Sequence, residues 1–370
     1  MPVKLEHWSL NFYKLPYRRE IVWANAVEQA GIFALLTLEG DNGAKGVAEG
    51  TIKATWSGVS PRSLAAVFED VLMPRLAGID IGAPAAVAAA LAGVPENRLA
   101  RGMLDSAAWV LHAATLGQPL WRLWGGAPTV DLTWAITRQA PLVMAREAAA
   151  MCARHGFGTL KVKGGQGLAT DLLAMREIRA AVGPDVALYV DANSAYPRSQ
   201  AVAYVQAIAD AGALVAEDPC PLLPDAEFSA LQRVSPIPVL IDRNCTSVGD
   251  AQAFIDKGGI ALSTKPGRIG LSEARAINDL AAAHGAKVAI GLYAESALGT
   301  LINLQQAAAL APAQALVAAE QTFFLEMSDQ VLTESLVIAQ GRIHMPEAVD
   351  VAGLIDRDKL GQYALKRSHD

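Results

Sequence analysis

The first 60 residues alternate between apolar and polar side chains, which is the pattern of strands with one buried face. One such run covers residues 3–12 and a second covers residues 31–39. Asp41-Asn42-Gly43 then predicts a tight turn, after which residues 45–50 return as a third strand. The pattern predicts a small antiparallel sheet at the start of the chain.

Between the first two runs, from about residue 16 to residue 29, the alternation is interrupted by polar and aromatic residues. They include Tyr17, Arg18, Arg19 and Trp23. We predict a loop here. A loop of this length and composition either covers a binding site or is a solvated connection.

The period becomes helical between residues 60 and 123. Pro61 favours the start of one helix and Pro74 its end, and a longer helix is expected over residues 99–112. Strands followed by helices are typical of an α+β unit. We therefore predict a first domain over residues 1–125.

From residue 130 the pattern alternates between apolar runs and amphipathic segments. The amphipathic segments include residues 143–155, 201–211 and 272–284. The apolar runs predict eight strands, at residues 132–136, 159–163, 187–191, 214–217, 239–242, 261–265, 287–291 and 323–327. Eight such alternations favour a closed parallel (β/α) barrel, a modified TIM barrel, over residues 126–330.

The remaining residues, 331–370, contain no further strand–helix unit. A strand and turn are expected around residues 337–344, and a helix should begin near Asp356. We expect this segment to pack back on the first domain. The predicted fold is thus α/β, a (β/α) barrel with an N-terminal α+β capping domain.

Composition narrows the class of protein. Hydrophobic residues make up 52% and charged residues 18% of the chain, which excludes a largely disordered protein. The net charge of −6 disfavours nucleic acids and anionic membranes as partners. Three cysteines without metal-type spacing, an N-terminus unlike a signal peptide and the lack of a long apolar run predict a cytoplasmic protein.

Three acidic residues stand at the ends of consecutive predicted strands. Asp191, Glu217 and Asp242 are separated by 26 and 25 residues, and Lys265 follows Asp242 by 23 residues. The carboxyl ends of parallel barrel strands meet at one rim, so these side chains should lie close together. Adjacent carboxylates repel one another unless they share a cation. Oxygen ligands alone favour Mg²⁺, with Mn²⁺ as an alternative, although such acids can also cap the following helices.

Lysines flank the acids along the chain. Lys161 and Lys163 point to the same side of one predicted strand, because side chains two residues apart share a face. Lys163 precedes the acids by one strand and Lys265 follows them by one strand, so the two amines should flank a bound ion. We expect nearby positive charge and desolvation to lower a lysine pKa toward neutrality, as a proton-accepting base requires.

Two further acids lie near later strand ends. Glu295 either hydrogen-bonds a lysine or the substrate, or caps the following helix. The alternation of apolar and polar residues in the last predicted strand does not decide whether Glu326 faces the acids and lysines.

These motifs resemble the enolase superfamily, in its muconate-lactonizing-enzyme subgroup. The resemblance is carried by Lys161-Val-Lys163, Asp191-Ala-Asn193, Glu217-Asp-Pro219, Asp242, Lys265 and the stretches 103–126, 295–300 and 354–360. It implies Mg²⁺ on the three acids, Lys163 and Lys265 as an acid/base pair, and Lys161 in support. It also implies that residues 16–29 and 51–58 close over a small carboxylate substrate, and that the chain forms a homo-oligomer. Asn193, Tyr17 and Trp23 are expected at the substrate.

One position departs from the family pattern. Arg243 follows the third acid, where the family usually has a glutamate. Its side chain should point away from the ion and pair with an acid or a substrate anion.

The resemblance implies proton transfer beside a carboxylate, first of all in a muconate-type cycloisomerase. An N-acylamino-acid racemase or an o-succinylbenzoate synthase would keep the same residues. A barrel that binds a carboxylate without catalysis is the alternative of another class.

Overall fold

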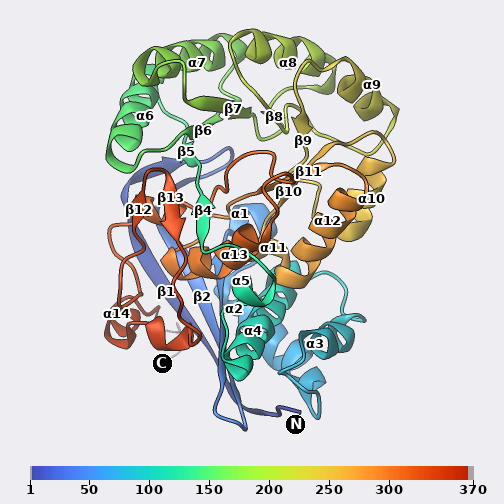
Figure 1. Cartoon of the computed structure of the whole chain (residues 1–370), viewed down its shortest axis with the longest axis vertical. Helices are drawn as coiled ribbons and strands as arrows, with labels where there is room; N and C mark the ends of the chain where they lie inside the picture. Colours follow the sequence, from blue (N-terminus) through green and yellow to red (C-terminus); the bar gives the residue numbers. More distant parts are fainter. Residues whose placement is uncertain (1, 366–370) are drawn as a thin grey trace.

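The computed structural model describes residues 2–365. Figure 1 shows two parts, a long twisted sheet with helices beside it and, above it, strands enclosed by an arc of helices. We call residues 2–125 the cap and the strand–helix region that follows it the barrel. The chain begins in the cap, and its C-terminal segment returns to the cap.

The cap is a three-stranded antiparallel sheet in the order β1 (Leu5–Val22), β2 (Val27–Gly40) and β3 (Lys45–Ile52). The predicted antiparallel sheet is confirmed, but the middle of β2 is buried on both faces, with Leu36 and Leu38 on one and Phe33 and Leu35 on the other. The helical elements of the cap are α1 (Ala54–Ser57), α2 (Pro61–Ala66), η1 (Val67–Leu72), η2 (Met73–Leu76), α3 (Pro84–Leu91), α4 (Arg98–Leu116) and α5 (Leu120–Leu123).

A glycine allows helix α4 to lie close against β3. A Cβ on Gly46 would stand 2.1 Å from the carbonyl oxygen of Ala107 in α4. Only a residue without a side chain leaves room for the helix backbone at this distance. The contact brings the sheet and α4 together around Leu104 and Leu111, which are fully buried.

The predicted loop over residues 16–29 is wrong in its extent. Strand β1 continues to Val22, β2 begins at Val27, and only the four residues between them form the turn. The pairing changes register between Pro16 and Ile21. This irregularity explains the lost alternation in the sequence, because a bulge shifts side chains from one face of the sheet to the other.

Parallel strands form the barrel. Five of them pair in one sheet, in the order β5 (Trp134–Ile136), β6 (Thr159–Lys163), β7 (Ala187–Asp191), β8 (Ala216–Glu217) and β9 (Val239–Leu240). A bridge between Ile241 and Leu262 joins them to β10 (Ala261–Thr264) and β11 (Lys287–Ile290). Bridges of Val288 to Ala315 and of Leu132 to Ala319 then complete the ring.

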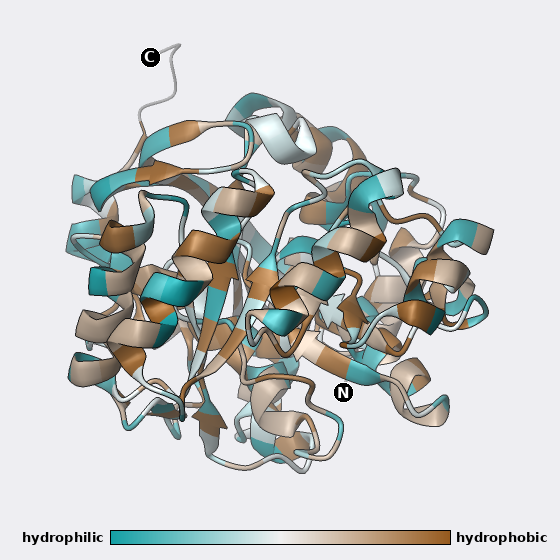
Figure 2. Ribbon diagram, turned by 90° about the horizontal axis from the view of Figure 1, so that it is seen from above, coloured by the Kyte–Doolittle hydropathy of each residue, from teal (hydrophilic) through white to brown (hydrophobic). Residues whose placement is uncertain are grey.

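The helices lie outside these strands, as Figures 1 and 2 show from two directions. The amphipathic segments predicted over residues 143–155, 201–211 and 272–284 are confirmed as helices. The barrel helices are α6 (Pro141–His155), α7 (Leu168–Val182), η3 (Arg198–Gln200), α8 (Ala201–Asp210), α9 (Ala226–Val234), α10 (Val248–Ile255), α11 (Pro266–Ile269), α12 (Leu271–Ala283) and α13 (Ala297–Ala309).

The eighth predicted strand, at residues 323–327, is wrong. Residues 323–326 form a 3₁₀ turn, η4 (Phe323–Glu326), and the ring is closed instead by residues 315–320. Phe323 packs against Tyr17 and Trp23 of the cap, with ring centroids 5.6 and 5.3 Å apart. The apolar run is therefore buried by the cap and not by neighbouring strands.

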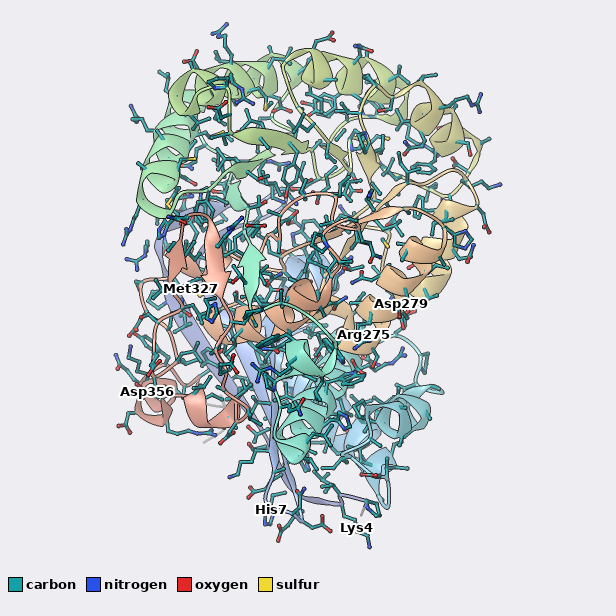
Figure 3. The ribbon with its side chains drawn as sticks, viewed as in Figure 1. Lys4, His7, Arg275, Asp279, Met327 and Asp356 are labelled. Atoms are coloured by element: carbon teal, nitrogen blue, oxygen red, sulfur yellow. The ribbon has the colours of Figure 1, made fainter. Side chains whose placement is uncertain are left out.

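Residues after the barrel contact both parts. Strands β12 (Ile338–Ala339) and β13 (Arg342–His344) extend β4 (Thr129–Asp131) into a small antiparallel sheet, as the strand-and-turn prediction required. The short turn η5 (Ala352–Leu354) precedes α14 (Arg357–Gln362), whose N-cap is Asp356, labelled in Figure 3. The N–H of Lys14 in β1 donates to the carbonyl of Tyr363.

A second contact joins cap and barrel on the opposite side. Asp105 of α4 accepts hydrogen bonds from the backbone N–H (2.8 Å) and hydroxyl (2.5 Å) of Ser272 at the start of α12. Arg275, labelled in Figure 3, lies over the ring of Trp124, 4.2 Å from its centroid. These contacts attach the first turns of a barrel helix to the cap.

Candidate active site

The three predicted acids lie side by side at the carboxyl ends of neighbouring strands. Asp191 is the register partner of Glu217, and Asp242 follows β9, the strand next to β8. All three are almost fully buried, with 0–2% of each residue exposed. Parallel pairing aligns strand ends, and so a spacing of about 25 residues in sequence becomes lateral contact in space.

The three predicted lysines contact these acids. The Nζ of Lys161 lies 2.7 Å from Glu217 and 3.1 Å from Asp191. Lys163 donates to Asp191 at 2.6 Å, and Lys265 donates to Asp242. Lys163 and Lys265 thus stand at opposite ends of the row of acids, with Glu217 between them.

One residue of this cluster was missed by the sequence analysis. Glu320 ends the strand that closes the barrel and is fully buried. Its two oxygens each lie 3.0 Å from Lys161 Nζ, and Oε1 also accepts the hydroxyl of Tyr189 at 2.7 Å. The available signal is an apolar run that ends in an acid, Leu316-Val-Ala-Ala-Glu320, although the run at 323–327 contains larger apolar residues.

The acids offer oxygens that suit a small hard cation. Burial, together with the negative charge of Asp191, raises the pKa of Glu217 well above its usual value. Oε2 of Glu217 and Oδ1 of Asp242 are buried and have no hydrogen-bond partner in the described chain, although Lys161 Nζ lies 2.7 Å from the first and Arg268 Nη2 lies 3.5 Å from the second. A divalent ion shared by the three carboxylates would add positive charge beside these oxygens and reduce the repulsion among the acids.

Among residues 2–365, no three acidic, histidine or cysteine side chains are arranged as a ready metal site. In this cluster, Lys163 and Lys265 contact Asp191 and Asp242 directly. Asn193 adds to the polar surroundings. Its backbone and side-chain N–H groups both donate to Oδ1 of Asp191, at 2.8 and 2.9 Å. Asn193 thus holds the orientation of the first acid and also lines the cavity beside the lysines.

The pKa of Lys265 differs from the prediction. Burial acts to lower this pKa, but the adjacent Asp242 carboxylate raises it, and the result lies above the usual lysine value. The predicted shift toward neutrality relied on the charge of a bound ion, and here the Asp242 carboxylate acts in the opposite direction. The reason is geometric, since the ammonium group faces a carboxylate directly and not another cation.

Glu295 is fully buried beside the site, but its oxygens are engaged elsewhere. They accept hydrogen bonds from the backbone N–H of Tyr293 at 2.7 Å and the side chain of Asn303 at 2.8 Å. The N-cap of α13 is Ser296, so the capping alternative for Glu295 is wrong. Burial raises the pKa of Glu295 to about 7.

The cap supplies the aromatic residues near the lysines. A small cavity of about 50 Å³ is lined by Lys163 and Lys265 from the barrel and by Trp23, Lys53 and Trp56 from the cap. Tyr17 stands behind these, with its hydroxyl 3.4 Å from Lys53 Nζ. Lys53 itself is paired with Glu28 and lies over the Trp23 ring, 4.3 Å from its centroid.

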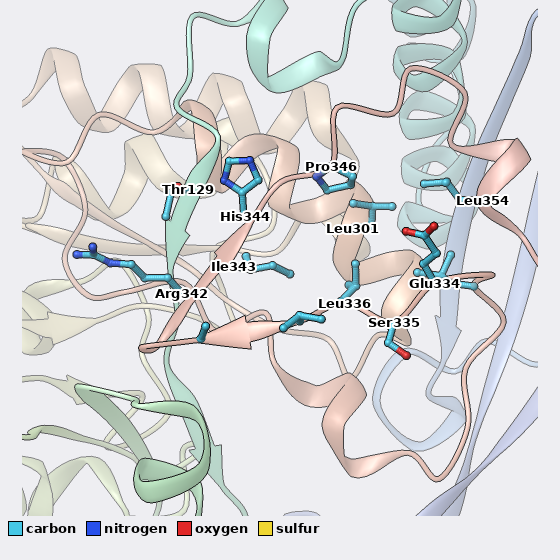
Figure 4. A pocket seen from close by; sticks show the side chains of 13 residues that line it. Thr129, Leu301, Glu334, Ser335, Leu336, Arg342, Ile343, His344, Pro346 and Leu354 are labelled. Atoms are coloured by element: carbon cyan, nitrogen blue, oxygen red, sulfur yellow. The ribbon is translucent and has the colours of Figure 1, made fainter.

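Two larger hollows differ in their position relative to the cavity beside the lysines. One of about 500 Å³ adjoins the small cavity and is lined in part by Arg243, which is exposed. Another of about 420 Å³, shown in Figure 4, lies between β4, β13 and the C-terminal segment, and Leu301 and Ile343 line it. The second hollow shares no residue with the cavity beside the lysines.

Comparison with known proteins now identifies the family. Residues 143–353 match the family model described as enolase C-terminal domain-like, and residues 14–125 match the mandelate racemase / muconate lactonizing enzyme N-terminal domain. The chain belongs to the enolase superfamily. Within it, the N-terminal match and the relatives below indicate the muconate-lactonizing-enzyme subgroup.

Relatives of this superfamily enzyme cover nearly its whole length. It is 28% identical to o-succinylbenzoate synthase from Geobacillus kaustophilus, over 85% of this chain and 81% of that one. It is 26% identical to muconate cycloisomerase 1-2 from Acinetobacter lwoffii, over 97% and 95%. The muconate lactonizing enzyme of Pseudomonas fluorescens, solved with muconolactone, superposes with a TM-score of 0.91 at 22% identity, over 99% and 100%.

The enolase-superfamily fold predicted from the sequence is confirmed by these comparisons and by the parallel ring of strands. None of the helices within residues 2–365 is both long and apolar enough to cross a membrane.

Arg243 is the residue at which the chain departs from the family pattern. Its exposed guanidinium lies over Trp56 of the cap, 5.0 Å from the ring centroid.

Proposed function

We propose that this protein transfers a proton to or from the carbon next to a substrate carboxylate, as a muconate-type cycloisomerase that depends on Mg²⁺. The observation that carries the proposal is the position of two lysines, Lys163 and Lys265, at opposite ends of three buried acids and on one small cavity. Two amines that face one reacting carbon from opposite sides can remove and deliver protons on either face.

Asp191, Glu217 and Asp242 are the proposed ligands for Mg²⁺, with Mn²⁺ as an alternative. When bound, the ion supplies positive charge that stabilises the negative charge developing on the substrate carboxylate. With their negative charge shared by a cation, Asp191 and Asp242 would stabilise the ammonium groups of Lys163 and Lys265 less, which would favour the neutral amine of a base.

The remaining residues have supporting roles in this proposal. Lys161, held between Glu217 and Glu320, orients the substrate carboxylate and adds positive charge beside it. In the lactone-forming direction, a substrate carboxylate oxygen adds to the conjugated double bonds, and Lys163 or Lys265 protonates the resulting carbanion. The aromatic residues of the cap, Trp23 and Trp56, exclude water from the cavity.

A second candidate has support of its own. The same lysines and acids would serve an o-succinylbenzoate synthase or an N-acylamino-acid racemase, and the o-succinylbenzoate synthase of Geobacillus kaustophilus is similar over 85% of this chain. A dipeptide epimerase is less consistent with the chain. The Asp-x-Asp pair that those enzymes carry at the end of the last strand is found neither at residues 323–328, the strand predicted from the sequence, nor at residues 320–322.

One experiment separates these functions. The protein is incubated in heavy water with Mg²⁺ and a panel of muconates, N-acyl amino acids and dipeptides, and products are followed by NMR. A muconolactone product supports the cycloisomerase, whereas deuterium at an α-carbon without ring formation supports the racemase. Mg²⁺ binding without exchange or product from any compound would instead indicate a binding protein that has lost catalysis.

We further infer, from the family resemblance, that the chain works as a homo-oligomer in the cytoplasm. Gel filtration with light scattering tests the oligomer, and a monomeric mass would contradict it.

A further inference from the structure

Arg138 follows β5 by two residues, and its side chain joins the ends of the next two strands. Its Nε donates to the carbonyl of Gly164 at 2.7 Å, and its Nη2 donates to the carbonyl of Ala192 at 3.3 Å. Gly164 directly follows Lys163, the last residue of β6. Ala192 directly follows Asp191, the last residue of β7. One guanidinium thus connects the backbone next to a proposed base with the backbone next to a proposed metal ligand.

The two carbonyls lie just beyond the paired part of these strands. The register of β6 and β7 ends with the pair of Lys163 and Asp191, and the N–H of Gly164 donates to the carbonyl of Asp191 at 2.9 Å. Gly164 and Ala192 are both buried. A buried carbonyl needs a donor, and Arg138 supplies one to each, although Ala192 also accepts the N–H of Ala195 at 3.1 Å.

The next residue, Gly165, leaves the space that the guanidinium occupies. A Cβ at this position would stand 2.6 Å from Nη2 of Arg138 and 2.6 Å from the carbonyl oxygen of Ala192. The φ of Gly165 is +79°, a conformation that glycine adopts without strain. The turn after β6 is therefore shaped to admit the arginine side chain against the backbone.

An acid fixes the other polar groups of this turn. Asp171 of α7 is 2% exposed and accepts the backbone N–H groups of Gly165 at 2.7 Å and Gln166 at 3.1 Å. The same carboxylate accepts two tyrosine hydroxyls, at 2.6 and 3.0 Å, from Tyr196 and Tyr204. Asp171 thus holds the N–H groups of the turn, whereas Arg138 holds a carbonyl.

The contacts of Arg138 concern one end of the row of acids. Lys163 donates to Asp191 at this end, at 2.6 Å. Lys265 donates to Asp242 at the other end, after a strand that Arg138 does not contact through its recorded hydrogen bonds. Loss of the guanidinium should therefore disturb Lys163 and leave Lys265 in place.

We propose that Arg138 is a positioning residue for Lys163. By joining the backbone after β6 to the backbone after β7, it sets the position of this lysine relative to Asp191. Arg138 does not line the cavity beside the lysines, so it acts through Lys163 and not on the substrate. The inference rests on the proposed function, because it concerns how one of the two proposed bases is held.

Proton exchange on the two faces of one carbon tests this role. N-succinyl-L-phenylalanine and its D enantiomer are incubated separately with the protein and Mg²⁺ in heavy water, and the initial rate of deuterium uptake at the α-carbon is measured by NMR. Lys163→Ala identifies the enantiomer from which Lys163 removes the proton, because exchange of that enantiomer is lost. The test variants are Arg138→Met, which keeps the length of the side chain without its donors, and Arg138→Lys.

Arg179→Met is the matched control. Arg179 also donates to two backbone carbonyls, those of Gly183 at 2.6 Å and Val186 at 2.7 Å. These carbonyls precede β7, at the end of the strand opposite to Asp191. The control therefore removes a similar structural contact that is not connected to the end of β6.

Arg138→Met should slow exchange of the Lys163 enantiomer by about 10- to 100-fold, the effect of a small displacement of a reacting group. Exchange of the other enantiomer should be nearly unchanged. Arg138→Lys should recover part of the loss, because an ammonium group can still donate to one carbonyl. Arg179→Met should show no difference between the enantiomers. Equal losses for both enantiomers in Arg138→Met, or no loss for either, would overturn the inference.

A second measurement needs no substrate. Brief acetylation of the folded protein with acetic anhydride, followed by mass spectrometry, gives the labelling of Lys163 relative to Lys265. In Arg138→Met this ratio should rise by about threefold or more, because a weaker hold on the end of β6 frees Lys163 from Asp191. Arg179→Met should keep the ratio of wild type.

This measurement separates the inference from the proposed function. An unchanged labelling ratio in Arg138→Met would overturn the positioning role, whatever the protein catalyses. A raised ratio in a protein that exchanges neither enantiomer and forms no product from any compound would keep Arg138 as the residue that holds Lys163 and would reject the catalytic proposal.

Discussion

At the scale of single residues, the site is built from opposite charges placed in contact. Each lysine of the cluster contacts at least one of the three acids, and Lys161 contacts two of these and Glu320 as well. Burial of so many charges is tolerated because they are mutually compensated. Removal of single charges therefore gives sharp tests of the proposed roles.

Lys265→Ala should lower turnover by about 10²- to 10⁴-fold, the usual contribution of a positioned acid or base. The fold should persist, as judged by circular dichroism, and Lys257→Ala, which removes an exposed lysine, is the control. Retained activity in Lys265→Ala would reject the mechanism with two lysines.

Asp191→Asn should weaken Mg²⁺ binding by at least about tenfold, because a neutral amide replaces an anionic ligand. Titration calorimetry measures the affinity, and Asp185→Asn controls for the loss of an exposed acid. Equal Mg²⁺ affinity in Asp191→Asn and wild type would show that the proposed ligand set is incorrect.

The pKa of Glu326 predicts a pH dependence of stability. Burial raises this pKa from 4.5 to about 7, although Arg19 at 2.6 Å opposes the shift. A raised pKa means that the folded state holds a proton that the unfolded state releases. The resulting stabilisation is complete below about pH 4.5 and disappears as the pH rises through 7.

Glu326→Gln should therefore lose less stability than wild type between pH 5 and pH 8. The difference expected from this shift is roughly 3 kcal/mol in the free energy of unfolding. Urea denaturation at both pH values measures it. Parallel pH profiles of the two proteins would contradict a raised pKa at this carboxyl group.

At the scale of elements, two similar apolar runs form different structures, one a 3₁₀ turn and the other a strand of the barrel. Residues 323–326 and 315–320 both follow α13 and both end in a glutamate, yet only the second run joins the ring of strands. A short apolar run satisfies either a strand or a buried turn, and so periodicity does not separate them. The difference places Glu320, and not Glu326, on Lys161.

The packing of α4 on β3 gives a test at this scale. Gly46→Ala should destabilise the protein by about 1–3 kcal/mol, because the added methyl group overlaps the backbone of α4. Gly93→Ala is a matched control, since a Cβ there meets no atom within 4 Å. Denaturant unfolding compares the two variants, and similar midpoints would mean that α4 moves aside without cost.

At the scale of the whole molecule, the cap and barrel meet at the active site through a buried carboxylate. Glu49 of β3 accepts the backbone N–H of Ser296 at 2.9 Å, and it accepts the hydroxyls of Ser296 and Tyr13. Ser296 begins α13 and directly follows Glu295. Glu49 thus connects a cap strand to a barrel helix beside the site.

Glu49→Gln should lower stability by about 1–3 kcal/mol, because an amide presents a donor where the hydroxyls need an acceptor. Turnover should also fall, since the cap no longer fixes the segment that carries Tyr293. Thermal unfolding and activity are measured against Glu6→Gln, an exposed control on β1. Unchanged stability would show that this contact between cap and barrel carries little energy.

By itself the sequence determined the family, the order of most elements and the lysines and acids of the site. These are local properties of the sequence. Each acid or lysine is recognised because it ends an apolar strand and because a regular number of residues separates it from the next charged residue. The same local pattern predicted the antiparallel cap and the start of α14 at Asp356.

Only the tertiary structure decided which run closes the barrel, that Glu320 holds Lys161, and which way the pKa of Lys265 shifts. It also decided that Arg243 and Arg268 share a hollow with Trp56, a residue far from both in sequence. The physical reason is that electrostatic interactions depend on distance in space. Closure of the ring and packing of the cap bring distant side chains together. The sequence around each of these residues does not indicate such a contact.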